Sequence, residues 1–226
     1  MQTIKEDYYA QNLNSQKLYK VYDTKIPRVR QYLDREINFV RKRLFSAEKV
    51  LELGVGYGRV LRELSSCASC FLGIDISPES VEFGKEHLKE FPHIHLMTMD
   101  AHKLDFENEF DAVLCLQNGL SALKGDALNL IGRSVKALRP GGMAYFSTYS
   151  GKFWNHRLAW FEEQADKGLL GEIDKENTCD GVIVCKDGFR AVTFTENDLI
   201  KLGEASGCEY IIHEEDESSL FLVITK

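Results

Sequence analysis

The feature that most constrains the fold is the regular alternation of short apolar strands with helices over residues 49–148. A strand at 49–53 runs into a glycine-dense turn and a helix from Arg59 to about Ser66. Four more strands are predicted after it, each preceded by a helix or a turn, at 71–76, 94–99, 110–116 and 143–148. Strands that alternate with helices pair in a parallel sheet with helices on both faces, so we expect an α/β fold.

The remaining segments do not follow this alternation. Residues 8–22 predict a helical arm and residues 29–44 an amphipathic helix, because apolar side chains recur at helical spacing. After residue 150 we expect an aromatic helix, a hairpin formed by 182–185 and 189–194, and a helix at 195–206. The last two strands, at 210–213 and 220–225, are expected to form an antiparallel edge.

Composition excludes several classes of protein. The chain has 226 residues, a net charge of −7 and 44% hydrophobic residues, which suits one soluble α/β domain better than a nucleic-acid-coating protein. No apolar stretch is long enough for a membrane span and the N-terminus lacks a secretory signal, so a cytoplasmic location is expected. Cys67 and Cys70 have no second ligand pair at zinc spacing, so we expect no metal site, and Cys115 and Cys208 are expected to be core thiols.

The turn after the first strand has the chemistry of a ligand site. Glycines at alternate positions, Gly54, Gly56 and Gly58, let the backbone approach a ligand closely. A dinucleotide fingerprint would place its third glycine at position 59, which is Arg59, so pyrophosphate recognition is disfavoured. Glu52, at the end of the strand, is placed to meet a cation such as an ammonium group.

Acids also follow the next two strands. Asp75 ends the second strand, where a carboxylate can accept hydrogen bonds from both ribose hydroxyls. Asp100 ends the third strand, either as a ligand contact or as the cap of a turn. Ribose recognition of this kind serves nicotinamide cofactors equally well, so it does not separate cofactors by itself.

The segment Val50-Leu51-Glu52-Leu53-Gly54-Val55-Gly56-Tyr57-Gly58 resembles the first motif of class I S-adenosylmethionine-dependent methyltransferases, and the resemblance extends through the following strands. It implies a Rossmann-like seven-stranded methyltransferase sheet. It also implies cofactor contacts from the turn, from the ribose and adenine segments, and from the end of the fourth strand: Glu52, Gly54, Gly56 and Gly58; Asp75 and Ile76; Asp100 and Ala101; Leu116 and Gln117.

The same resemblance divides a single domain, residues 1–226, into four parts. Residues 1–45 form a helical lid and residues 46–149 the cofactor-binding core. Residues 150–192 form an insertion that serves as lid and substrate wall, and residues 193–226 complete the sheet. S-adenosylmethionine is the expected cofactor, and a small-molecule acceptor is the expected partner, with no nucleic acid and no membrane.

Methyl transfer from a sulfonium is an in-line displacement on an activated carbon, so positioning is the main catalytic device and a triad is not required. Candidates for a catalytic role are Tyr22, Asn118 and His156. Residues 116–121 lack the proline-bearing motif of nucleobase and some protein amine methyltransferases, which disfavours those acceptors. A nitrogen acceptor is weakly preferred over oxygen.

The N-terminal arm loosely resembles the lid of small-molecule N-methyltransferases of the glycine and sarcosine type. If the acceptor is a carboxylated amine, Arg28 or Arg30 is expected to bind its carboxylate, and Arg28 is preferred. The predicted acceptor contacts are Arg28, Asn118, Tyr149, Trp154 and Trp160. Two other functions stay open: an NAD-dependent oxidoreductase, and a cofactor-binding regulatory subunit without chemistry.

Overall fold

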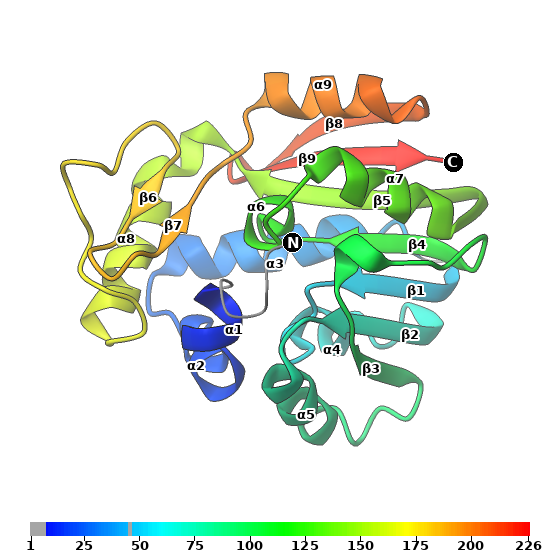
Figure 1. Cartoon of the computed structure of the whole chain (residues 1–226), viewed down its shortest axis with the longest axis horizontal. Helices are drawn as coiled ribbons and strands as arrows, with labels where there is room; N and C mark the ends of the chain where they lie inside the picture. Colours follow the sequence, from blue (N-terminus) through cyan, green and yellow to red (C-terminus); the bar gives the residue numbers. More distant parts are fainter. Residues whose placement is uncertain (1–7, 45–46) are drawn as a thin grey trace.

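A seven-stranded sheet forms the centre of the computed structural model, which describes residues 8–44 and 47–226 (Figure 1). Its strand order is β3-β2-β1-β4-β5-β9-β8. The first five strands are parallel, and β9 runs antiparallel to both β5 and β8. The predicted α/β fold with an antiparallel edge is confirmed. The strands are β1 (Ala47–Leu53), β2 (Ala68–Asp75), β3 (Ile94–Thr98), β4 (Phe110–Cys115), β5 (Leu138–Tyr149), β8 (Glu209–Glu215) and β9 (Ser219–Thr225).

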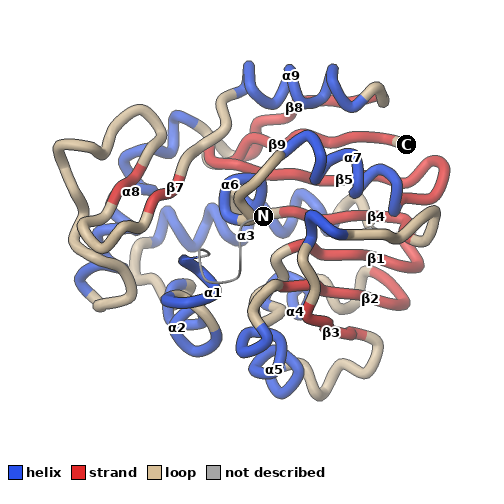
Figure 2. The backbone as a smooth tube through the Cα atoms, in the orientation of Figure 1, coloured by secondary structure: helices blue, strands red, loops and turns tan. Residues whose placement is uncertain are grey.

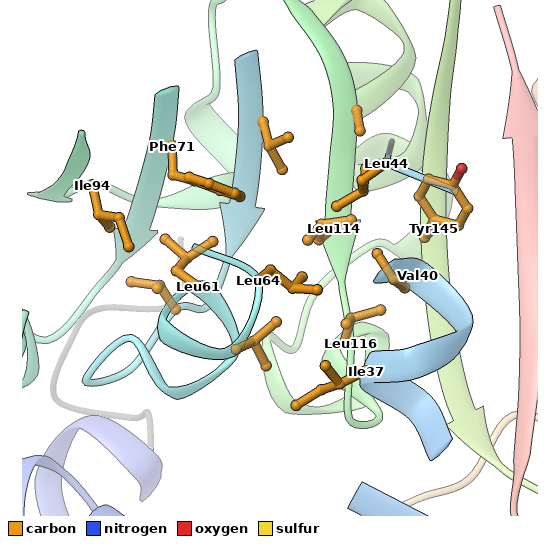
Figure 3. Close-up of a cluster of buried hydrophobic side chains, with 14 of the residues drawn as sticks. Ile37, Val40, Leu44, Leu61, Leu64, Phe71, Ile94, Leu114, Leu116 and Tyr145 are labelled. Atoms are coloured by element: carbon orange, nitrogen blue, oxygen red, sulfur yellow. The ribbon is translucent and has the colours of Figure 1, made fainter. Parts of the chain in front are cut away.

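Helices cover both faces of this sheet. One face is covered by α3 (Pro27–Arg41), α4 (Arg59–Glu63) and α5 (Pro78–His87). The other is covered by α6 (Gly119–Ala122), α7 (Ala127–Ala137) and α9 (Glu196–Ser206). In the first core, Val40 and Leu44 lie over Leu114 and Tyr145, and Leu61 lies beside Phe71 (Figure 3). This packing holds the strands against the helices, including β1, whose carboxyl end leads into the glycine turn.

Helix α3 belongs to two cores at once. Pro27 begins it, where the missing N–H costs no helical hydrogen bond. Its C-terminal half packs Ile37 and Val40 against the sheet. Its N-terminal half packs Val29 and Tyr32 into a third, separate cluster. The helix therefore joins the sheet to the layer that covers the sheet's carboxyl edge.

That covering layer combines the arm with the insertion. It contains α1 (Tyr8–Asn12), α2 (Ser15–Val21), α8 (Trp154–Asp166), β6 (Ile183–Val184) and β7 (Arg190–Ala191), joined by long loops (Figure 2). The hairpin exists as predicted, but each strand pairs over only two residues. Tertiary burial of Ile183 and Phe189, more than the ladder itself, holds it in place.

Two details differ from expectation, and a third lies outside the described residues. Strand β5 already begins at Leu138, so it includes the residues predicted as a turn before it. Gly141, in this stretch, has φ +80° and donates its N–H to the Lys226 carbonyl, which keeps the stretch bonded to the end of the neighbouring strand. Cys115 is buried, but Cys208 is only half-buried. The predicted boundary between residues 45 and 46 lies outside the described residues. None of the helices in the described part is long and apolar enough to cross a membrane.

Candidate cofactor and acceptor site

A pocket opens at the carboxyl ends of β1, β2 and β4, between the sheet and the covering layer. Its sheet side is formed by the glycine turn, by the ends of β2 and β4 and by α6. Its other side is formed by the arm and the insertion. Ligands of open α/β sheets bind at this edge, so the pocket is the candidate site. The predicted residues that line it are Tyr22, Glu52, Gly54, Gly56, Asp75, Ile76, Leu116, Gln117, Tyr149 and Trp160.

On the side of the turn that lines the pocket, the backbone conformation and the nearby arm both favour glycine. Gly56 has φ +56°, which L side chains rarely adopt, and an added Cβ would lie 2.6 Å from the Leu18 side chain of the arm. Gly58 has another role, since it does not line the pocket. It begins α4 at φ +85°, and a Cβ there would lie 2.3 Å from Leu88. Gly58 is therefore a packing glycine in this structure, and its predicted cofactor contact is not supported.

Asp75 organises the turn from the neighbouring strand. Its Oδ2 accepts the Gly56 N–H at 2.8 Å, and its Oδ1 accepts the Ser77 N–H at 2.9 Å. Each carboxylate oxygen can accept more than one hydrogen bond, which is the chemistry that recognition of ribose hydroxyls requires. The same side chain thus lines the pocket and fixes the backbone that surrounds it.

Two oppositely charged side chains at the pocket wall, Glu52 and Arg59, have buried polar atoms without a hydrogen-bond partner among the described residues. Glu52 is 4% exposed, and its Oε2 is buried without a hydrogen bond among the described residues. Burial raises the pKa of its carboxyl well above the usual range, and the Arg59 charge only partly offsets this. Arg59 also lines the pocket, with Nε and Nη2 buried and unpaired within the described chain. An acid and a base with open hydrogen-bonding groups fit the ammonium and carboxylate of an amino-acid moiety.

The predicted adenine segment has a different set of partners. Asp100 begins the 3₁₀ helix η2 (Ala101–Lys103) and accepts the His102 N–H at 2.9 Å. Its carboxylate also pairs with Lys103 at 3.1 Å, and these contacts lower its pKa despite partial burial. Neither Asp100 nor Ala101 is among the lining residues. The capping alternative is what the hydrogen bonds show, and an adenine contact stays a prediction.

The segment after β4 is held in a strained conformation. Gln117 and Asn118 have φ values of +55° and +62°, which are rare for residues other than glycine. The buried Glu36 of α3 accepts the Gln117 N–H at 3.0 Å and the Ser147 hydroxyl. Ser147 in turn accepts the Gln117 N–H at 2.8 Å. Helix α3 and strand β5 thus fix the position at which Gln117 faces the pocket.

Comparison with known proteins identifies this arrangement. Residues 50–142 match the model of a methyltransferase domain family. Residues 50–142 are therefore similar to a methyltransferase domain, whose methyl donor is S-adenosylmethionine. The unpaired Glu52 and Arg59 fit the amino-acid moiety of that donor, and the nicotinamide alternative is set aside.

Relatives of this methyltransferase domain are distant. The ubiquinone biosynthesis O-methyltransferase of Hydrogenovibrio crunogenus is 25% identical over 124 residues, which cover 54% of this chain and 51% of the relative. The chain therefore spans about half the length of the curated relatives it matches.

Solved structures share the fold over nearly the whole chain. The PH0226 protein of Pyrococcus horikoshii has a TM-score of 0.69 at 19% identity, covering 92% of this chain and 98% of its own. A Burkholderia thailandensis 1,6-didemethyltoxoflavin-N1-methyltransferase has a TM-score of 0.62 at 18% identity, covering 100% of this chain and 91% of its own. Identities this low establish the methyltransferase fold alone.

Aromatic rings form the wall of the pocket on the side of the covering layer. Tyr22 comes from the arm, Tyr149 from β5, and Trp160 from α8, whose Nε1 donates to the Val21 carbonyl at 3.1 Å. Phe161 and Phe189, whose ring centroids are 5.7 Å apart, complete the wall. Arm and insertion are thus joined across the methyltransferase pocket.

Three predicted acceptor or catalytic residues lie elsewhere. Asn118 is buried behind the pocket, where its Nδ2 donates to the Val192 carbonyl at 2.8 Å and its Oδ1 accepts from Thr148 at 2.8 Å. Its amide nitrogen and oxygen thus join the insertion to β5, and Asn118 is not among the lining residues, so its catalytic role stays a prediction. His156 is exposed on α8, and Trp154 is half-buried outside the lining.

Arg28 is also outside the pocket, contrary to the predicted carboxylate clamp. Its Nη1 pairs with the Asp216 carboxylate at 2.7 Å, and its Nη2 donates to the Asp216 carbonyl. Its guanidinium lies 5.1 Å from the Phe153 ring centroid. The two guanidinium donors of Arg28, which were predicted to bind an acceptor carboxylate, thus bind Asp216 in the β8–β9 turn. Arg30 is exposed and donates to the Thr24 carbonyl.

This placement gives a direct prediction. Arg28→Lys is expected to lower stability by about 1 kcal/mol, because lysine cannot reproduce the two contacts with Asp216. Binding of S-adenosylhomocysteine and the Michaelis constant of any acceptor should stay unchanged. Urea unfolding and calorimetry measure the two effects. A raised acceptor Michaelis constant without lost stability would restore the carboxylate clamp.

Two site residues were missed by the sequence argument. Arg59 was considered only as a missing glycine, although a basic residue directly after a ligand-binding turn is itself a signal. Glu36 was overlooked, although it is an acid on the apolar face of α3, between Leu33 and Val40. A charge at a core position of an amphipathic helix is rare unless it has a specific partner.

Proposed function

We propose that the protein transfers the methyl group of S-adenosylmethionine to a neutral, planar small molecule, at nitrogen. The observation that carries this proposal is the aromatic wall formed by Tyr22, Tyr149, Trp160, Phe161 and Phe189. Flat rings offer broad contact to a planar acceptor and favour a positive charge that develops on it. Arm and insertion together make the acceptor pocket.

The charges of the pocket support a neutral acceptor. Among the described residues, its charged lining consists of Glu52, Asp75 and Arg59, all at the glycine-turn end. Arg59 is the one cation of that described lining and lies 4.5 Å from the Tyr22 ring centroid. We assign it to the carboxylate of the donor, so a carboxylated amine of the glycine type would have no second cation there. The resemblance of the arm to glycine and sarcosine enzymes therefore does not extend to the acceptor.

Nitrogen is favoured because the wall lacks a ready base. Burial raises the pKa values of Tyr22 and Tyr149, so both hydroxyls keep their protons at neutral pH. The described lining contains no histidine. A neutral amine needs only a lone pair aimed at the methyl carbon, whereas a hydroxyl must also lose its proton. Distant relatives are named for both oxygen and nitrogen acceptors, so they do not decide the question.

The bound donor supplies an electrophilic methyl group on a sulfonium. The side chains of this protein have to align an acceptor with it and exclude water. Gln117, whose backbone N–H is held by Glu36 and Ser147, lines the same pocket as the glycine turn and the aromatic wall. The aromatic wall keeps the acceptor in a dry environment. After transfer, the amine proton leaves to solvent, since the aromatic wall provides no base for it.

Transfer of labelled methyl groups tests this proposal. We expect turnover with neutral heteroaromatic amines, little with the matched phenols and none with glycine or sarcosine. Trp160→Phe, which keeps a ring but loses the bond to Val21, should raise the acceptor Michaelis constant by about two- to tenfold. Arg62→Met, on the outer side of α4, is the matched control. Turnover with glycine, or with phenols alone, would contradict the proposal.

A further inference from the structure

Arg59 holds a position that the acceptor proposal does not use. Its side chain lines the pocket beside the glycine turn, at the first residue of α4. Nε and Nη2 are buried, and neither has a hydrogen-bond partner among the described residues. Unsatisfied buried donors on a cation are costly, so this side chain is placed for a partner that comes with a ligand.

The surroundings of Arg59 specify that partner. Glu52 and Glu36 are near enough for the Arg59 charge to lower their pKa values against the larger effect of burial. Neither forms an ion pair with Arg59 within 4.0 Å, and no other acid of the described chain does. A guanidinium offers parallel donors that match the two oxygens of a carboxylate. Glu52, with its own unpaired oxygen, remains available for an ammonium group.

The same guanidinium contacts the arm. Its carbon atom lies 4.5 Å from the centroid of the Tyr22 ring. Tyr22 follows the end of α2 and also faces Tyr57 and Trp160, at centroid distances of 6.1 and 6.2 Å. Arg59 therefore joins a wall of the donor site to the segment that closes over it.

We propose that Arg59 binds the α-carboxylate of S-adenosylmethionine and that this contact makes closure of the arm depend on the donor. With the arm closed and no carboxylate, two guanidinium donors are buried without partners, which favours opening to water. A bound carboxylate accepts from these donors and so removes that cost. It also holds the guanidinium in place, where the Tyr22 ring of the arm packs on it. The donor thus binds the closed state more tightly than the open state, which is the condition for a population shift.

Ligand pairs that differ only in the carboxylate test the binding half. Arg59→Met should weaken S-adenosylhomocysteine by about tenfold or more and its decarboxylated analogue by less than about threefold. Arg59→Lys, which keeps the charge but loses the paired donors, should be intermediate. Arg62→Met, one turn along α4 and outside the pocket, should leave both affinities unchanged. Equal weakening of both ligands by Arg59→Met would overturn the assignment.

Hydrogen exchange of residues 8–22 tests the closure half and does not depend on the acceptor. In the parent protein and in Arg62→Met, S-adenosylhomocysteine should slow exchange of the arm by about tenfold more than the decarboxylated analogue does. In Arg59→Met at saturating ligand this difference should disappear. An unchanged thermal unfolding curve of the free variant excludes general misfolding. Equal protection by both ligands in the parent protein would overturn the coupling.

Discussion

Replacement of Asp75 by alanine is expected to weaken S-adenosylhomocysteine binding by about 1.5–3 kcal/mol, or about 10- to 150-fold. The variant loses an ionised acceptor for the ribose hydroxyls. It also leaves the Gly56 and Ser77 N–H groups without their present partner, so the turn itself becomes less ordered. Asp75→Asn keeps one acceptor oxygen and should be intermediate. Calorimetry of both variants measures the effect.

Asp126→Ala is the matched control for this experiment. Asp126 caps α7 on the outer surface, where its Oδ1 accepts from Leu128 and Asn129. Its loss should cost about 1 kcal/mol of stability and leave ligand affinity unchanged. Parental affinity in both Asp75 variants would show that the ribose does not lie against this side chain.

The second large effect concerns Glu52 and pH. Because burial raises the pKa of Glu52 in the free protein, its carboxyl stays neutral to a higher pH than that of an ordinary glutamate. An ammonium group on the ligand stabilises the ionised form, so binding releases a proton. Affinity for S-adenosylhomocysteine should therefore rise with pH up to the raised pKa of Glu52. It should fall again as the ligand's own amine loses its proton near pH 8.

Calorimetry in two buffers of different ionisation enthalpy counts the released protons. Glu52→Gln cannot release one, so its binding should show neither the proton count nor the rising limb. It should also be weaker by about 1.5–3 kcal/mol at pH 7. An equal proton count in Glu52→Gln would assign the release to another group.

The free protein should show the opposite pH trend. A raised carboxyl pKa in the folded state stabilises the fold at low pH, and this contribution is lost as pH rises through that pKa. Glu52→Gln should therefore unfold at higher denaturant concentration than the parent at pH 8, with a smaller difference near pH 5.

The sheet and its order could be predicted because its signals are local. Apolar runs, turn glycines and acids after successive strands are all visible in sequence, and the parallel geometry then brings Glu52, Asp75 and Gln117 to one edge. The same argument applies to Tyr149, at the carboxyl end of β5, and Tyr22 and Trp160 followed from the expectation that the arm and the insertion cover that edge.

The structure places predicted site residues outside the pocket where their side chains bond to partners far away in the sequence. Arg28 pairs with Asp216, 188 residues away, and Asn118 bonds to Val192 in the insertion. No local pattern encodes those choices, which depend on how the β8–β9 turn and the insertion fold back. Arg59 was missed for a related reason. What marks it as a ligand contact is that two of its buried donors have no hydrogen-bond partner among the described residues, and only the packed structure shows this.

Helix α3 sets a limit on how the protein could be re-engineered. One continuous helix presents Glu36 to Gln117 and, one turn earlier, Tyr32 to the rings of Tyr149 and Phe153. A transplanted acceptor module that included α3 would disturb the methyl-transfer segment along with the acceptor wall. Chimeras should therefore be joined upstream of Pro27, where the donor half of one parent and the arm of another can be exchanged as separate units.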